Sequence, residues 1–264
     1  MSVTTTRRLV GRVRAQAAPT SRPDELAVED PLVLALDGDV LATLMRTPGH
    51  DLELAAGWLV VESGVRAPAD VATLRACRED ETDRVHVTLA DGVRPPRPRA
   101  FITSAACGVC SADVIDLAPL RWAPPHHDGW RVDGAVLAGL PDAMREQQRA
   151  FDRTGAVHAA ALAAASGELL VVREDVGRHN AVDKVVGHSL LNGRLPATDQ
   201  LLVVSGRVSF EIVQKAVAAS VAGIVAVSAP TSLAVDLARQ AGLLLVGMAR
   251  NGGYNTYAGG ELVR

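Results

Sequence analysis

Residues 200–250, QLLVVSGRVSFEIVQKAVAASVAGIVAVSAPTSLAVDLARQAGLLLVGMAR, decide the fold class of this chain. Short, continuous apolar runs alternate with longer stretches in which apolar residues recur at helical spacing. Such runs are typical of strands that are buried on both faces, and their alternation with helices is typical of a parallel sheet. We therefore predict an α/β fold with a largely parallel or mixed sheet and helices on both of its faces. The predicted strands are residues 200–206, 224–230 and 243–250, and the predicted helices are residues 209–223 and 231–242.

The same alternation extends upstream of this stretch. We expect a buried strand at residues 169–175 and a helix at residues 180–191. Another helix is expected at residues 135–151, with Pro141 in its first turn or at a kink. A connector rich in proline and glycine precedes these elements. Together they form a predicted α/β lobe over residues 130–264.

The N-terminal part of the chain has a different pattern. Asp37-Gly38 separates two apolar runs, and this dipeptide is typical of a type I′ hairpin turn. A helix is expected at residues 51–64, and residues 84–92 alternate like a half-buried strand. We assign residues 26–125 to a smaller α+β lobe. Residues 1–25 form a predicted N-terminal arm that is partly mobile.

The composition excludes several classes of protein. The chain has 264 residues, a net charge of −3 and a pI of about 6.2, so its overall charge does not favour nucleic acid or a membrane surface. Its N-terminus lacks the apolar segment of a signal peptide. Three cysteines do not make a disulfide framework. These features predict a cytoplasmic protein that binds neither nucleic acid nor membranes.

Lysine is rare in this chain. Only two of the 27 basic residues are lysines, Lys184 and Lys215, and arginine supplies the others. Two explanations stay open. Either these positions need the compact ammonium group of lysine, or arginine is simply preferred throughout the chain.

Polar segments follow four of the predicted strands, and three of these segments contain arginine. The carboxyl ends of parallel strands meet at one edge of a sheet, where ligands commonly bind. Three of the segments also precede a predicted helix, whose free N–H groups favour an anion. The sequence therefore predicts a site for an anionic ligand at this edge. The four segments are residues 173–180, 205–211, 228–232 and 249–255.

A CGVC motif places two residues between Cys107 and Cys110, a spacing used by zinc sites, redox disulfides and sulfur carriers. A structural zinc site is disfavoured because the chain has a single such pair, Cys77 is isolated, and no histidine pair has finger spacing. A zinc deaminase is disfavoured because Ala160 stands where the catalytic glutamate would follow His158. We therefore expect no intrinsic metal.

The remaining chemistries differ in what they require around the thiols. A thioredoxin-type disulfide would lie at the start of a helix in a βαβ unit, whereas Cys107 and Cys110 follow a proline-rich loop. A sulfur carrier needs an exposed thiolate in a positive environment. Arg94, Arg97 and Arg99 can supply that environment. Sulfur transfer is therefore favoured, and a dithiol oxidoreductase stays open as an alternative.

Five segments of the chain resemble the motifs of the formate dehydrogenase accessory sulfurtransferase family (FdhD/NarQ). They occur in family order and span nearly the whole globular part. The five segments are RTPGHDLELAAGWLVVESG (46–64), CGVC (107–110), TGAVHAA (154–160), REDVGRHNAVDKVVG (173–187) and VSGRVSFEIVQKA (204–216).

This resemblance implies a function. A family member accepts persulfide sulfur from a cysteine desulfurase. It passes the sulfur to the molybdenum cofactor, Mo-bis(molybdopterin guanine dinucleotide), before the cofactor is inserted into formate dehydrogenase. The resemblance also implies a cytidine-deaminase-like C-terminal lobe without zinc, and a homodimer. A chaperone that only escorts the finished cofactor is a second alternative.

The resemblance also assigns candidate site residues. Cys107 matches the persulfide cysteine of the family, and Cys110 matches its companion. The segment assigned to cofactor binding matches Met248, Ala249, Arg250, Asn251, Gly252 and Gly253. We add Arg207 and His179 from the strand-end segments, although His179 would equally suit a structural role, as Asp175 would suit a helix cap.

Overall fold

The computed structural model describes residues 4–15, 18–79, 81–96, 120 and 122–264. Its larger sheet has six strands in the order β12-β11-β10-β9-β7-β8. Strands β9, β10 and β11 are parallel, whereas β7 is antiparallel to both of its neighbours and β12 is antiparallel to β11. The sheet is therefore mixed. Its strands are β7 (His158–Ala163), β8 (Leu169–Asp175), β9 (Leu201–Val204), β10 (Gly223–Ala226), β11 (Leu244–Arg250) and β12 (Gly253–Ala258).

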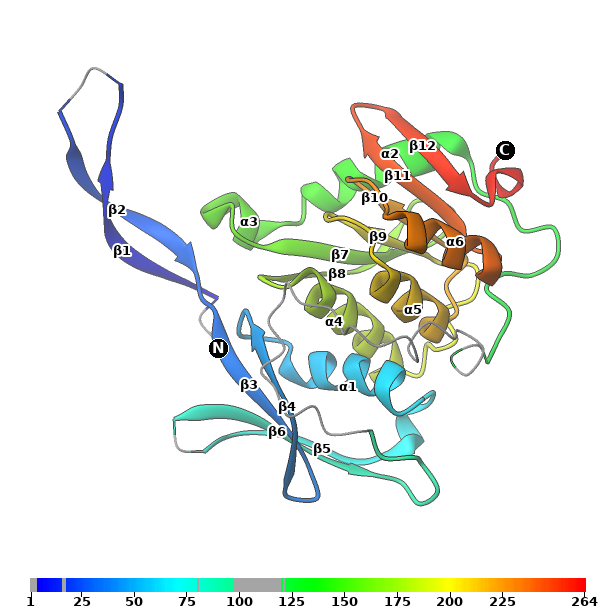
Figure 1. The fold of residues 1–264 in the computed structure, drawn as a ribbon, viewed down its shortest axis with the longest axis horizontal. Coiled ribbons are helices and arrows are strands. Elements are labelled where there is room, and N and C mark those ends of the chain that lie inside the picture. The colour runs from blue at the N-terminus through cyan, green and yellow to red at the C-terminus, as the bar shows by residue number, and fades with distance from the viewer. Residues whose placement is uncertain (1–3, 16–17, 80, 97–119, 121) are drawn as a thin grey trace.

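Helices cover both faces of this sheet, as predicted (Figure 1). Strand β9 illustrates why: Leu202 and Val204 pack into one hydrophobic cluster, and Leu201 and Val203 pack into the other. The first cluster lies under α4, α5 and α6, and the second lies under α2. A strand that is apolar at every position needs a helix on each side. The helices are α2 (Gly134–Arg145), α3 (Arg149–Thr154), α4 (Arg178–Leu191), α5 (Phe210–Ala219) and α6 (Ser232–Ala241).

A second sheet has four strands in the order β4-β3-β6-β5. Asp37 and Gly38 both have positive φ and join β3 to β4, which confirms the predicted hairpin turn. Helix α1 lies between this sheet and α4, and one hydrophobic cluster continues through all three (Figure 1). The elements are β3 (Asp30–Leu36), β4 (Asp39–Arg46), α1 (Asp51–Glu62), β5 (Val71–Glu79) and β6 (Thr82–Leu89).

Two glycines allow α1 and α4 to pack closely. A Cβ atom on Gly57 of α1 would lie 1.9 Å from the carbonyl oxygen of Asp183 on α4. A Cβ atom on Gly187 of α4 would lie 1.8 Å from the carbonyl oxygen of Glu53 on α1. No side chain fits at either position, so glycine fixes the separation of the two helices.

The N-terminal arm has more regular structure than the sequence predicted. Strands β1 (Thr5–Arg12) and β2 (Thr20–Ala27) pair in an antiparallel hairpin that projects from the body (Figure 1). Near the base of the hairpin, Arg153 of α3 is 3.2 Å from Glu25 of β2. The sequence of this hairpin shows no alternation of apolar and polar residues, because most of its residues are polar and both of its faces are exposed.

Other sequence predictions need correction. Strand β7 is not among the predicted elements, because its run of alanines has low strand propensity, yet β7 is a central strand. The helix expected at residues 135–151 is divided into α2 and α3, and Pro141 lies inside α2. Strand β8 lies at an edge and is only partly buried. Within the described parts of the chain, no helix is long and apolar enough to cross a membrane.

Candidate functional site

Four strands of the larger sheet end at the same edge. Strands β8, β9, β10 and β11 point in one direction, because β7 is antiparallel to both β8 and β9. Helices α4, α5 and α6 begin directly after β8, β9 and β10, so three helix N-termini also lie there. The predicted convergence of these segments is confirmed, and we call this part of the molecule the strand-end edge.

His179 and Glu211 lie within ion-pair distance of each other at the strand-end edge. Nε2 of His179, in the first turn of α4, is 3.0 Å from Oε2 of Glu211 in the first turn of α5. It is also 3.2 Å from Oγ of Ser209, the N-cap residue of α5. The hydrogen bond to His179 lowers the pKa of Glu211. His179 therefore joins two helix N-termini, and part of its function is structural.

Arg178 and His158 lie beside this pair. Nε of Arg178 is buried and has no hydrogen-bond partner among the described residues. His158, the first residue of β7, has its Nδ1 3.4 Å from Oγ of Ser205. Burial, together with the positive charges of Arg178 and His179, lowers the pKa of His158. The lowered pKa favours the neutral form of His158, and Arg178 beside it can donate to a polar or anionic ligand.

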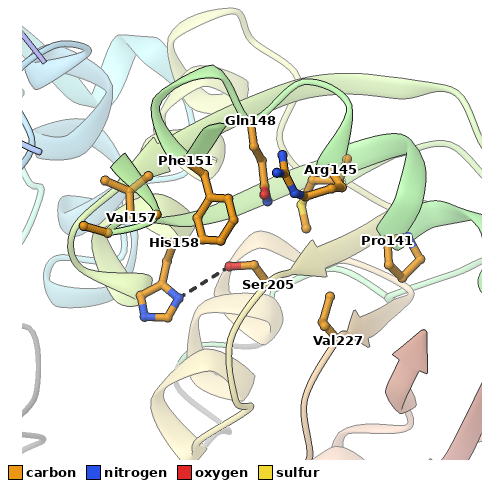
Figure 2. A pocket seen from close by; sticks show the side chains of 11 residues that line it. Pro141, Arg145, Gln148, Phe151, Val157, His158, Ser205 and Val227 are labelled. Atoms are coloured by element: carbon orange, nitrogen blue, oxygen red, sulfur yellow. Dashed lines mark hydrogen bonds between the residues drawn. The ribbon is translucent and has the colours of Figure 1, made fainter. Parts of the chain in front are cut away.

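A pocket of about 470 Å³ opens at this edge, on the α2 side of the sheet. Figure 2 shows His158 and Ser205 at its base, with Phe151 and Val157 on one side and Pro141 and Val227 on the other. Such apolar walls with a few polar groups are typical of sites for small-molecule ligands. The other lining residues are Met144, Arg145, Gln148, Gly155 and Ala156.

The predicted cofactor-binding segment forms the turn between β11 and β12. Asn251 and Gly252 both have positive φ, and Arg250 pairs with Gly253 across the turn. Arg250, Asn251 and both glycines are exposed, and so is Arg207 after β9. Their polar groups are therefore free to contact a ligand.

The two other residues of this segment have different surroundings. Ala249 is fully buried in the cluster under α2, so its side chain supports the sheet. Met248 is half-buried and has a φ of 54°, in an irregular part of the β11–β12 pairing. Neither side chain is as accessible as that of Arg250.

Asp175, Asn180 and Lys184 form a buried polar network. Nζ of Lys184 is 2.7 Å from Oδ2 of Asp175 and donates a 2.9 Å hydrogen bond to the carbonyl oxygen of Thr47. The side-chain amide of Asn180 donates to Oδ1 of Asp175 and to the carbonyl oxygen of Met45. This network joins the segments at 46–64 and 173–187, and it is structural.

Lys215 has a similar partner. Its Nζ is 2.6 Å from Oδ1 of Asp183, which is almost fully buried in α4. Both lysines of the chain thus neutralise a buried aspartate of the α4 region. This supports the view that these two positions need a compact ammonium group.

Cys107 and Cys110 lie outside the described residues, as do Arg97 and Arg99. Arg94 precedes this segment and is exposed. After the segment, Nε1 of Trp122 donates a 2.8 Å hydrogen bond to the carbonyl oxygen of Ala218. Ala218 is near the C-terminal end of α5, the end remote from Ser209. This hydrogen bond therefore anchors the chain to the body at Trp122, downstream of Cys110.

Sequence reasoning missed part of the strand-end edge. Ser205 and Glu211 were within predicted segments but were not singled out, and His158 was considered only as a zinc ligand. The pocket could not be predicted because α2 and α3 border it and neither carries a recognisable motif. The one sequence feature that pointed to this pocket is the TGAVHAA segment at 154–160, which contains four of its lining residues, among them His158.

The family comparison covers nearly all of the body. The model of the FdhD/NarQ family matches residues 27–264. The chain belongs to the FdhD/NarQ family. Among its relatives, the sulfur carrier protein FdhD of Corynebacterium efficiens is 47% identical over 90% of this chain and 91% of its own length. The sulfur carrier protein FdhD of Streptomyces coelicolor is 47% identical over 100% of this chain and 97% of its own length.

The FdhD/NarQ fold is also shared with a solved structure. A crystal structure described as that of a formate dehydrogenase accessory protein from Desulfotalea psychrophila has a TM-score of 0.80. The similarity covers 99% of this chain and 100% of that chain, with 22% sequence identity. This likeness supports the mixed α/β architecture.

Proposed function

We propose that this FdhD/NarQ member is a sulfur carrier that matures formate dehydrogenase. The observation that supports this most directly is the family match over residues 27–264, with relatives named sulfur carrier proteins. In this proposal Cys107 receives sulfur from a cysteine desulfurase. The sulfur then passes to the molybdenum cofactor, Mo-bis(molybdopterin guanine dinucleotide), before the cofactor enters formate dehydrogenase.

The loading step needs no external oxidant or reductant. The Cys107 thiolate attacks the terminal sulfur of the desulfurase persulfide, a new S–S bond forms, and the desulfurase cysteine leaves as a thiolate. Cys107 then carries a persulfide. The arginines before the cysteine motif stabilise the thiolate and the persulfide, which are both anionic.

In the release step, the thiolate of Cys110 is the reductant. It attacks the Sγ atom of the Cys107 persulfide, a Cys107–Cys110 disulfide forms, and the terminal sulfur leaves at the oxidation level of sulfide, ready to bond to the cofactor metal. A cellular thiol then reduces the disulfide for the next cycle. Here the cofactor is cargo, and the protein holds no metal of its own for this chemistry.

The strand-end edge is the proposed binding site for the guanine nucleotide end of the cofactor. Arg178, Arg207 and Arg250 supply charged donors to the diphosphate, and His179 lies at two helix N-termini beside them. The neighbouring pocket with His158 at its base suits a flat heterocycle. We place this function in the cytoplasm, in a homodimer.

Two other functions make different demands on Cys107. A cofactor-escort chaperone would not need its thiol, and a dithiol oxidoreductase would need both thiols but no sulfur donor. In cells that lack their own carrier, the wild-type protein should restore formate dehydrogenase activity and Cys107→Ala should not. Full restoration by Cys107→Ala would favour the escort and overturn the proposal. The control is Arg12→Ala, at an exposed position on the projecting β1–β2 hairpin, which should restore activity as the wild type does.

A further inference from the structure

A cluster of metal-binding side chains lies on the four-stranded sheet, far in sequence from the CGVC motif. Cys77 and Glu79 are two residues apart at the end of β5, so their side chains point to the same face. His86 on β6 points to this face too, because Val85 and Val87, its neighbours in sequence, are buried in the core. The three side chains therefore meet on the face opposite the core.

The three donor atoms already lie close together. Nε2 of His86 is 2.8 Å from Oε1 of Glu79, and Sγ of Cys77 is 3.3 Å from the same oxygen. All three atoms lie within 4.8 Å of one another. In a tetrahedral zinc site with bonds of about 2.0–2.3 Å, two ligand atoms are roughly 3.3–3.8 Å apart. Small side-chain rotations would bring these atoms to that geometry.

The kinds of donor indicate which ion fits. A thiolate, an imidazole and a carboxylate suit Zn²⁺, whereas Mg²⁺ and Ca²⁺ prefer oxygen ligands alone. One thiolate and one carboxylate balance the charge of a divalent cation. Nε of Arg84 is 3.3 Å from Oε2 of Glu79, so this carboxylate can bind an ion through Oε1 while Arg84 orients it through the other oxygen.

We propose that Cys77, Glu79 and His86 form a three-ligand site for Zn²⁺, with water in the fourth position. This proposal replaces the expectation of no intrinsic metal, which treated Cys77 as isolated because Glu79 and His86 were not considered with it. Binding replaces the thiol proton of Cys77, which passes to solvent, and no electrons are transferred. The site would link β5 to β6 beside the turn that joins them. Its residues are distant in sequence from Cys107 and Cys110, and among the described residues it is the only cluster of this kind.

Cobalt binding gives a direct test, because a Co²⁺–thiolate bond absorbs light and reports a cysteine ligand. The full-length Cys107→Ser/Cys110→Ser variant removes the other thiol pair and leaves Cys77 as the one cysteine. This variant should bind one equivalent of Co²⁺ with a thiolate absorption band, and Zn²⁺ should displace the cobalt. Adding Cys77→Ser should abolish the band, and adding His86→Gln should weaken binding by at least about 10-fold.

The control is His127→Gln in the same background, since the side chain of His127 is 65% exposed and lies outside the cluster; it should bind as the parent variant does. Absence of a thiolate band in the Cys107→Ser/Cys110→Ser variant would overturn the proposal. So would unchanged Zn²⁺ affinity, measured by calorimetry, after His86→Gln. The side chain of His86 is 26% exposed, so the His86→Gln variant should fold. It therefore tests the site even if Cys77→Ser does not fold.

Discussion

Nζ of Lys184 lies 2.7 Å from Oδ2 of Asp175, and both side chains are at most 1% exposed. The pair connects the middle of α4 to the end of β8, and Thr47 contacts both of its members. It therefore joins the smaller sheet to the larger one at a position next to the strand-end edge. Placement of Arg178 and His179 depends on this buried pair.

Removal of Lys184 should destabilise the protein strongly. Lys184→Met leaves Asp175 buried without a counter-charge, which should lower the free energy of unfolding by about 3–5 kcal/mol. Urea unfolding followed by circular dichroism measures this loss. Lys184→Met combined with Asp175→Asn should recover part of the loss, because the unpaired charge is gone. A double variant less stable than Lys184→Met alone would show that the ion pair is not the cause.

The contact between α1 and α4 should not tolerate a methyl group. Gly57→Ala and Gly187→Ala each force a Cβ atom into a backbone carbonyl group of the facing helix, so each should lower stability by more than about 3 kcal/mol or prevent folding. Thermal unfolding of the purified variants measures this effect.

Gly139→Ala is the matched control. Gly139 lies inside α2, and a Cβ atom there would meet nothing within 4 Å. Alanine favours a helix over glycine, so this variant should gain roughly 0.5–1 kcal/mol. Equal stability of Gly57→Ala and Gly139→Ala would contradict the packing that we describe.

His158 should make stability fall at mildly acidic pH. Burial lowers the pKa of His158 below its ordinary value of 6.5, with Arg178 and His179 acting in the same direction and Asp175 against it. Below that pH the unfolded chain takes up a proton that the folded protein resists, so the free energy of unfolding decreases as pH falls. Urea unfolding at pH 7 and pH 5.5, both above the ordinary range of carboxylates, measures the decrease.

His158→Gln should show a smaller decrease over this interval, because its side chain does not titrate. The His126→Gln variant serves as the control and should behave as the wild type does, because His126 is half-buried against Trp130 and is not among the groups that shift the pKa of His158. The same decrease in all three proteins would mean that His158 does not contribute.

Arginines of the strand-end edge should bind the nucleotide part of the cofactor. Arg178→Gln and Arg250→Ala should each cost about 1.5–3 kcal/mol, or roughly ten- to a hundredfold in affinity for GDP, since charge-assisted contacts to phosphate are lost. Calorimetric titration with GDP measures this. Arg12→Ala on the projecting hairpin should bind GDP as the wild type does. Absence of GDP binding to the wild type would count against the site.

Much of the α/β lobe was predictable because strands β9 and β10 and most of β11 are apolar and buried. The three strands and two helices predicted for residues 200–250 occur in the predicted order. They were recognisable because a strand buried on both faces is a continuous apolar run in the sequence. Strand β7 was not predictable from its alanines, and its antiparallel direction made the sheet mixed. Hairpin β1–β2 was missed because it lies outside the core and has no hydrophobic alternation.

The candidate site was predictable at its strand ends and less so elsewhere. Arg178, Arg207 and Arg250 follow predicted strands, so topology alone places them at one edge. The roles of Asp175 and Lys184 depend on a contact with Thr47 that is distant in sequence, which no local pattern encodes. Ala249 belongs to a matched motif, yet its side chain faces the core, because alternate residues of a strand face opposite sides.

The central claim is that Cys107 carries sulfur, and intact mass measures it most directly. After incubation with a cysteine desulfurase and cysteine, the wild-type protein should gain the mass of one sulfur atom, which a reducing agent removes. Cys107→Ala should gain none. Cys77→Ala should gain sulfur as the wild type does, because desolvation and a hydrogen bond to Glu79 raise the pKa of Cys77 and make it a poor nucleophile. Sulfur loading of Cys107→Ala equal to that of the wild type would contradict the account.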